Sequence, residues 1–134
     1  MTTERPPEDQ ITALVDRFYD LCRADPVLGP FFAATIKDWD GHIQLVRDFW
    51  SRSLLGTERY RGNVFGSHLG MAIEPAHFDL WLAAFKQAVA ETLSPFLAQQ
   101  ALARAAHMSQ SIQVGLFPYK DANGRPTRRP PWET

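Results

Sequence analysis

The sequence contains a single cysteine, Cys22, in 134 residues. One cysteine cannot form an intramolecular disulfide, a CxxC zinc site, an iron–sulfur cluster held by cysteines or the C-x-x-C-H attachment of a c-type haem. A metal held by this protein must therefore be bound by histidine or carboxylate side chains. Cys22 falls at an apolar position of a helical pattern, so we expect a packed small side chain rather than a nucleophile.

The chain also lacks an excess of positive charge. Lys and Arg total 14, Asp and Glu total 15, and the formal net charge is −1, which is not the electrostatic footprint of a nucleic-acid-binding protein. No apolar run approaches the roughly 18 residues of a membrane span, and the polar N-terminus has no apolar signal-peptide core. We therefore expect a protein of the cytoplasm that binds neither nucleic acid nor a membrane.

Common catalytic signatures are missing as well. The sequence has no G-x-x-x-x-G-K-[ST] or G-x-G-x-x-G phosphate-binding loop and no G-x-S-x-G nucleophile elbow. Glu74 and His77 form one Glu-x-x-His motif, but a di-iron helical bundle needs two and no second copy exists. We interpret Glu74 as a helix-start residue whose charge suits the positive end of the helix dipole.

Apolar residues recur with helical spacing through most of the chain. From Ile11 to Cys22 they fall at offsets 3, 4, 7, 8 and 11, which predicts a helix that ends at Asp25, the residue before a proline. Residues 27–32 predict a turn and a short helix. A second long helix is predicted to begin near residues 38–40, where an aspartate can cap it, and to end at Gly56.

The second half of the sequence also predicts long helices joined by loops. Residues 56–67 contain three glycines and predict a loop, and a short apolar segment follows at 68–73. Pro75 and Pro95 stand where proline favours the first turn of a helix, and the apolar spacing after each predicts a long helix. No segment shows the alternation of a strand, so we predict an all-α fold.

The organisation indicates a single domain over residues 1–134. We expect its core to cover about residues 9–116. The polar segments 1–8 and 117–134 contain several prolines, and we expect them to be flexible ends.

Four histidines supply the metal-binding nitrogens. His68 follows the glycine-rich loop, and a loop histidine that faces an apolar cavity can offer a neutral imidazole to a metal. His42 lies on the apolar stripe of its helix, where a satisfied core histidine and a cavity-facing one are both open interpretations. For His77 and His107 we expect structural roles.

Aromatic residues make up 12% of the chain, and four of them are Trp. Together with two histidines that face the interior, this composition suggests a planar apolar cofactor, and haem fits best. Tyr19 and Trp81 lie on inner helical stripes, and their O–H and N–H groups need partners when buried. A diatomic ligand bound to the cofactor would accept hydrogen bonds from both.

At this point the sequence resembles the group III truncated haemoglobins over about residues 11–114. The motifs Phe-Trp-Ser, Tyr-x-Gly-Asn and His-Phe-Asp-x-Trp-Leu, in this order, are specific together although each is weak alone. The blocks that carry the resemblance are Arg17-Phe18-Tyr19, residues 25–32, Asp38-Trp39-Asp40-Gly41-His42, Asp48-Phe49-Trp50-Ser51, Leu54-Leu55-Gly56, Arg59-Tyr60-Arg61-Gly62-Asn63, His68 and residues 76–82.

The resemblance implies a truncated globin, with a two-over-two helical sandwich around non-covalent haem b. It places His68 as the proximal iron ligand, 13 residues before Trp81, and Tyr19, His42 and Trp81 in the distal pocket. His42 is open to two interpretations, a swinging ligand gate or a sixth iron ligand.

The other expected haem contacts come from both halves of the chain. Arg59, Tyr60 and Arg61 are candidates for the haem propionates, and the alternative is a solvated basic loop. The expected apolar contacts are Phe32, Val46, Phe49, Trp50, Phe65, Met71, Ile73, Met108 and Ile112.

The function that follows is reversible binding of O₂ and other diatomic ligands (CO, NO, cyanide) by a monomeric haem protein. One alternative is a haem-dependent redox enzyme, with peroxidase-like or nitric oxide dioxygenase activity and a reductase as its electron source. The other is a haem-free helical interaction module.

Overall fold

The computed structural model describes residues 5–62, 73–130 and 132. Its helices confirm the predicted all-α class, and within the described residues none is long and apolar enough to cross a membrane. They are α1 (Pro7–Ala24), α2 (Leu28–Thr35), α3 (Trp39–Leu55), α5 (Pro75–Thr92) and α6 (Pro95–Leu116).

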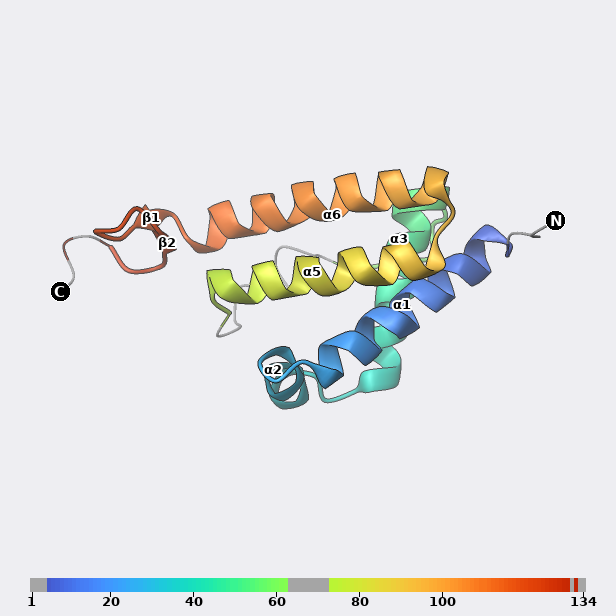
Figure 1. Cartoon of the computed structure of the whole chain (residues 1–134), viewed down its shortest axis with the longest axis horizontal. Helices are drawn as coiled ribbons and strands as arrows, with labels where there is room; N and C mark the ends of the chain where they lie inside the picture. The colour runs from blue at the N-terminus through green and yellow to red at the C-terminus, as the bar shows by residue number, and fades with distance from the viewer. Residues whose placement is uncertain (1–4, 63–72, 131, 133–134) are drawn as a thin grey trace.

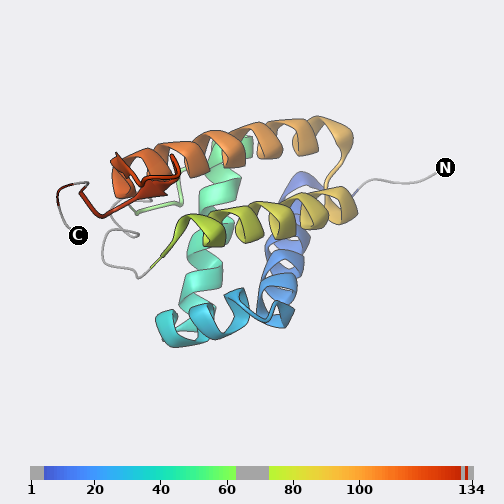
Figure 2. The ribbon, with the colours of Figure 1, turned by 60° about the vertical axis from the view of Figure 1, so that its left-hand side comes forward.

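The long helices form two crossed pairs. Helices α5 and α6 lie side by side (Figure 1) and cross over α1 and α3, which make the second pair (Figure 2). Helix α1 packs on α5, and α3 packs on α6. This arrangement is the predicted two-over-two sandwich, and the short α2 closes the end where α1 turns toward α3.

Local chemistry explains where the helices begin and end. The Asp38 carboxylate accepts a hydrogen bond from the Gly41 backbone N–H at 3.1 Å and caps α3. Gly56 ends that helix in the left-handed region, with φ of 75°. Helix α1 begins at Pro7, earlier than the apolar pattern from Ile11 indicates, because a first-turn proline and an acidic first turn favour a helix start.

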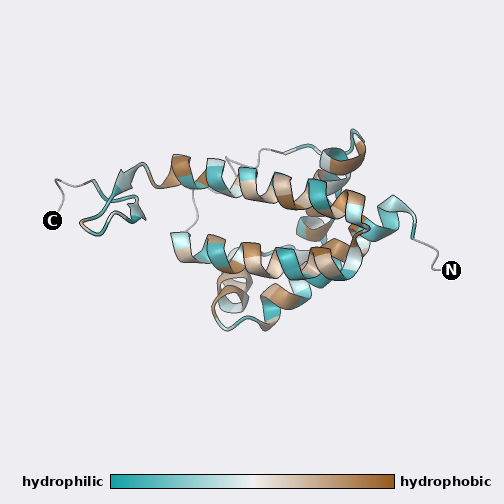
Figure 3. Ribbon diagram, turned by 45° about the horizontal axis from the view of Figure 1, so that its top comes forward, coloured by the Kyte–Doolittle hydropathy of each residue, from teal (hydrophilic) through white to brown (hydrophobic). Residues whose placement is uncertain are grey.

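The main core lies where α1, α3 and α5 meet. Phe85 is stacked between two indoles, with ring centroids 4.8 Å from Trp50 and 5.4 Å from Trp81. Cys22 is fully buried in the same core. Burial, aided by the charge of Asp25, raises the pKa of its thiol to about 12, which agrees with the expected packed, inert side chain. Figure 3 shows apolar and polar residues alternating along the long helices.

The C-terminal tail contains structure that the pattern did not predict. β1 (Tyr119–Lys120) pairs antiparallel with β2 (Pro126–Thr127), and this small hairpin lies beyond the end of α6 (Figure 1). The Asp121 carboxylate accepts hydrogen bonds from the backbone N–H groups of Asn123 and Arg125 and shapes the turn. Strands of two residues are too short to produce an alternating pattern, so the sequence pattern gave no sign of this hairpin.

Candidate functional site

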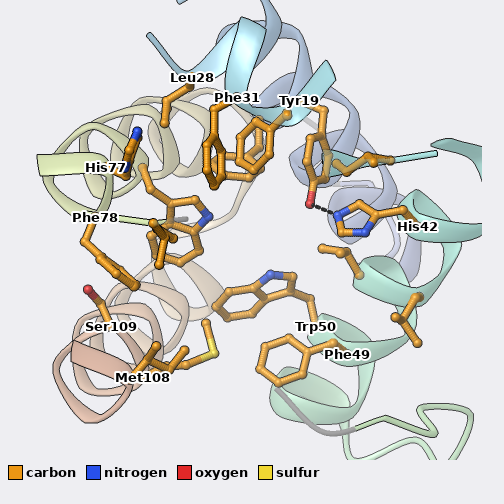
Figure 4. A pocket seen from close by; sticks show the side chains of 18 of the residues that line it. Tyr19, Leu28, Phe31, His42, Phe49, Trp50, His77, Phe78, Met108 and Ser109 are labelled. Atoms are coloured by element: carbon orange, nitrogen blue, oxygen red, sulfur yellow. Dashed lines mark hydrogen bonds between the residues drawn. The ribbon is translucent and has the colours of Figure 1, made fainter. Parts of the chain in front are cut away.

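A cavity of about 170 Å³ lies between the two helix pairs, and every described helix contributes to its wall (Figure 4). Protein interiors are close-packed, and voids larger than a water molecule are few. The cavity is therefore a built feature of the fold. Apolar and aromatic side chains form most of its wall.

Most of the site residues expected from the sequence meet in this cavity. Those that line it are Tyr19, Phe32, His42, Val46, Phe49, Trp50, Tyr60, Ile73, Trp81, Met108 and Ile112. His68, Phe65 and Met71 lie outside the described residues. The expected roles of these three remain predictions.

Arg59 and Arg61 do not line the cavity. Arg59 donates to the Glu8 carboxylate and to the Ser51 hydroxyl, both at 2.8 Å, and to Asp48 at 3.4 Å. The hydrogen bond from Arg59 is the main reason that the pKa of Glu8 is lowered. In this arrangement Arg59 ties the start of α1 to α3, and a contact with a propionate stays a prediction.

Tyr19 and His42 form the polar centre of the cavity. The Tyr19 hydroxyl lies 2.7 Å from His42 Nε2, within hydrogen-bond distance (Figure 4). Tyr19 is only 6% exposed, and burial raises the pKa of its phenol well above the ordinary value. The phenol therefore keeps its proton at neutral pH and remains a hydrogen-bond donor.

Trp81 supplies a second polar group to the wall. Its ring lies nearly parallel to Phe85, at an interplanar angle of 4°, and meets Phe18 edge-on at 5.6 Å. These contacts fix the indole plane. Within the described parts of the chain, no acceptor meets its N–H. This donor is available to a molecule bound in the cavity.

His77 has the helix-start role expected for the Glu-x-x-His motif, and it also reaches the cavity. Its Nδ1 accepts the backbone N–H of Glu74 at 2.8 Å at the start of α5. Its ring stacks on Phe31 with centroids 4.7 Å apart. Since capping uses Nδ1, the Nε2 side of the ring remains for other contacts.

Sequence reasoning missed several residues of the wall. Some of them carried a signal: Phe18 and Phe78 belong to the apolar stripes of their helices, and Phe31 adjoins the predicted Phe32. The wall residues that were not proposed as site residues are Phe18, Leu28, Phe31, Ile36, Leu45, His77, Phe78 and Ser109.

Known protein families provide the decisive comparison. The family model described as bacterial-like globin matches residues 7–114. The chain belongs to the bacterial-like globin family. The match spans all five described helices of this globin except the last residues of α6.

Two characterised globins resemble this one. A group 3 truncated hemoglobin of Campylobacter jejuni is 28% identical over an alignment of 117 residues, and the alignment covers 84% of this chain and 92% of the relative. The crystal structure of the group III truncated hemoglobin from Campylobacter jejuni has a TM-score of 0.80 and 27% identity, and covers 89% of this chain and 98% of its own.

A thermostable hemoglobin from the actinobacterium Thermobifida fusca has a TM-score of 0.68 and 27% identity, over 78% of this globin and 89% of its own chain. The resemblance to group III truncated haemoglobins is thereby confirmed.

Membership in the globin family implies that the chain binds haem. The cavity fits that group. A porphyrin needs a large apolar enclosure with few polar groups, and here aromatic and aliphatic side chains surround the polar groups of Tyr19, His42 and Trp81.

Proposed function

We propose that this globin holds haem b non-covalently and reversibly binds O₂ and other diatomic ligands. The observation that carries the proposal is the Tyr19–His42 pair, 2.7 Å apart and set in an apolar cavity. The indole of Trp81 in the same wall supports it. Binding of diatomic gases such as O₂ is also the general property of the globin family.

The haem supplies an iron atom at which a diatomic gas binds, and His68 is the residue we propose as its proximal ligand. The protein supplies the surroundings. Phe32, Phe49 and Met108 are part of the apolar wall that excludes water from the iron. Exclusion of water strengthens every hydrogen bond made inside the cavity.

The hydrogen bond between Tyr19 and His42 can run in either direction. If the phenol donates to Nε2, its only proton is used within the protein. If Nε2–H donates to the phenol oxygen, the hydroxyl proton of Tyr19 is released toward a bound ligand, and His42 fixes its direction. A preorganised donor of this kind stabilises a ligand that carries partial negative charge, by about 1.5–3 kcal/mol.

For His42 we propose the gate rather than the sixth iron ligand. Its Nε2 lies at hydrogen-bond distance from the Tyr19 oxygen, and a nitrogen engaged in that bond does not coordinate a metal. Absorption spectra of the ferric and ferrous protein test this assignment. A low-spin spectrum, the mark of two histidine ligands, would contradict it.

The cofactor and its ligand are tested together by purification. The protein is expected to be red with a Soret band, and acidified butanone should extract the haem because no cysteine thioether holds it. His68→Ala should lose stoichiometric haem or its normal spectrum. His107→Ala, at an exposed position of α6, is the matched control. A His68→Ala protein with full haem and an unchanged spectrum would refute the proximal assignment.

A further inference from the structure

The ring of Tyr19 is held by four aromatic neighbours that all meet it edge-on. Phe18, Phe32 and His42 belong to the cavity wall. The fourth, Trp39, has its ring centroid 5.9 Å from that of Tyr19 at 85°, and it is not part of the wall. Trp39 therefore contacts Tyr19 from outside the cavity.

Trp39 is itself fixed by a cation. The guanidinium carbon of Arg23 lies 4.0 Å from the centroid of the Trp39 ring, a close cation–π contact. Arg23 and Tyr19 are four residues apart on α1 and thus share one face of that helix. The indole of Trp39 bridges these two neighbouring positions of α1.

Trp39 and His42 lie on the same side of the first turn of α3. Trp39 is the first residue of α3, and His42 follows three residues later on the same side of the helix. Both contact the ring of Tyr19, at 5.9 and 5.4 Å between centroids. A displacement of the first turn of α3 would move both together and lengthen the hydrogen bond between Tyr19 and His42.

We propose that Trp39, clamped by Arg23, is a positioning residue that holds Tyr19 and His42 in register and thereby slows the release of the bound diatomic ligand. This inference rests on the proposed function. Trp39 itself does not line the cavity. Its effect passes through the Tyr19 hydroxyl.

The test is a double-mutant cycle on haem-loaded protein, with O₂ dissociation measured by stopped flow. Trp39→Leu should speed dissociation about 3- to 10-fold in the wild-type background, a size typical of coupling between contacting residues. In a Tyr19→Phe background the same change should have almost no effect. Trp39→Phe should restore most of the wild-type rate, because it keeps an aromatic edge.

Two further readouts separate positioning from general destabilisation. The C–O stretching band of the CO complex should shift in Trp39→Leu and return in Trp39→Phe. The crystal structure of Trp39→Leu should show a longer distance from Tyr19 Oη to His42 Nε2 than 2.7 Å. Should Trp39→Leu fail to fold, the exposed Arg23→Gln carries the test, with a smaller change in the same direction and with Arg23→Lys as the control.

The outcomes distinguish this inference from the proposed function. An equal acceleration by Trp39→Leu in both backgrounds, or none in the wild type while Tyr19→Phe is fast, would overturn the positioning role alone. No change in Tyr19→Phe would overturn the distal account of ligand binding. In that case an unchanged Tyr19–His42 distance in Trp39→Leu would overturn the positioning role too, and a lengthened one would support it.

Discussion

At the scale of single residues, the pocket depends on two donors whose positions are fixed in different ways. Tyr19 is held by a hydrogen bond to His42 and by a ring of aromatic edges. Trp81 is held by stacking on Phe85 and by an edge-on contact with Phe18. Since both rings are fixed before a ligand arrives, little reorganisation opposes a hydrogen bond to it.

Replacement of either donor should weaken ligand retention. Tyr19→Phe and Trp81→Phe keep an aromatic ring but remove the O–H or N–H, and each should speed O₂ dissociation by roughly 10- to 100-fold. Stopped-flow displacement of O₂ by CO measures the rate. Phe78→Leu, which alters the wall without removing a donor, is the control. Unchanged rates in both donor variants would contradict the proposed pocket.

The residues of the cavity wall were predictable from the sequence where an apolar side chain falls on the regular stripe of a helix. Val46, Phe49 and Trp50 follow from the stripe that starts at His42, and all of them line the cavity. Arg59 shows the limit. Its partners Glu8 and Ser51 are 51 and 8 residues away in the sequence, and no local pattern indicates which distant carboxylate a long flexible cation will meet.

At the scale of elements, the positions at which helices begin and end were the most predictable feature. Asp38, Gly56, Pro75 and Pro95 stand at helix ends because each has a backbone or capping preference that acts locally. The start of α1 was predicted too late because its first turn is polar and carries no apolar periodicity. The spacing of apolar residues does not indicate which helices cross. The two-over-two arrangement was predicted from the family resemblance alone.

Gly56 provides a direct test of how the end of α3 contributes to stability. Its φ of 75° lies in the left-handed region, and a Cβ there would meet no atom within 4 Å, so the cost of Gly56→Ala is purely conformational. We expect about 1 kcal/mol less stability for Gly56→Ala and a smaller loss for Gly56→Asn. Urea unfolding measures both.

The control is Gly124, which has the same φ in the C-terminal hairpin. Because the hairpin lies outside the two core clusters, Gly124→Ala should leave the free energy of global unfolding nearly unchanged. Equal losses at the two glycines would show that the cost does not come from the end of α3.

At the scale of the whole molecule, the C-terminal hairpin lies beyond the end of the globin helices. The family match ends at residue 114. In the part of the chain that the structure describes, the last buried residue of a core cluster is Phe117, which is 5% exposed and meets Phe78 edge-on. Arg128, the residue after β2, contacts that cluster, since its guanidinium carbon lies 5.5 Å from the Phe117 ring centroid.

Removal of residues 119–134 should therefore preserve haem binding and reduce stability only by about 1 kcal/mol, the size of one exposed cation–π contact. Phe117→Ala in the full chain should cost about 3 kcal/mol, because it leaves a cavity in the core. Thermal unfolding monitored at the Soret band compares the two. Loss of haem on removal of the tail would show that the tail belongs to the site.

Cys22 gives the molecule a built-in reporter of its own opening. Its thiol is inaccessible in the core and is protonated at neutral pH, so a thiol-reactive reagent modifies it only in molecules whose α1 has separated from the rest. The chain has no other cysteine, and each modified molecule therefore records one such event. The rate of labelling therefore measures how often α1 separates from the rest of the protein. Comparing this rate with and without haem or its ligands shows how far each suppresses the opening, and no engineered probe is needed.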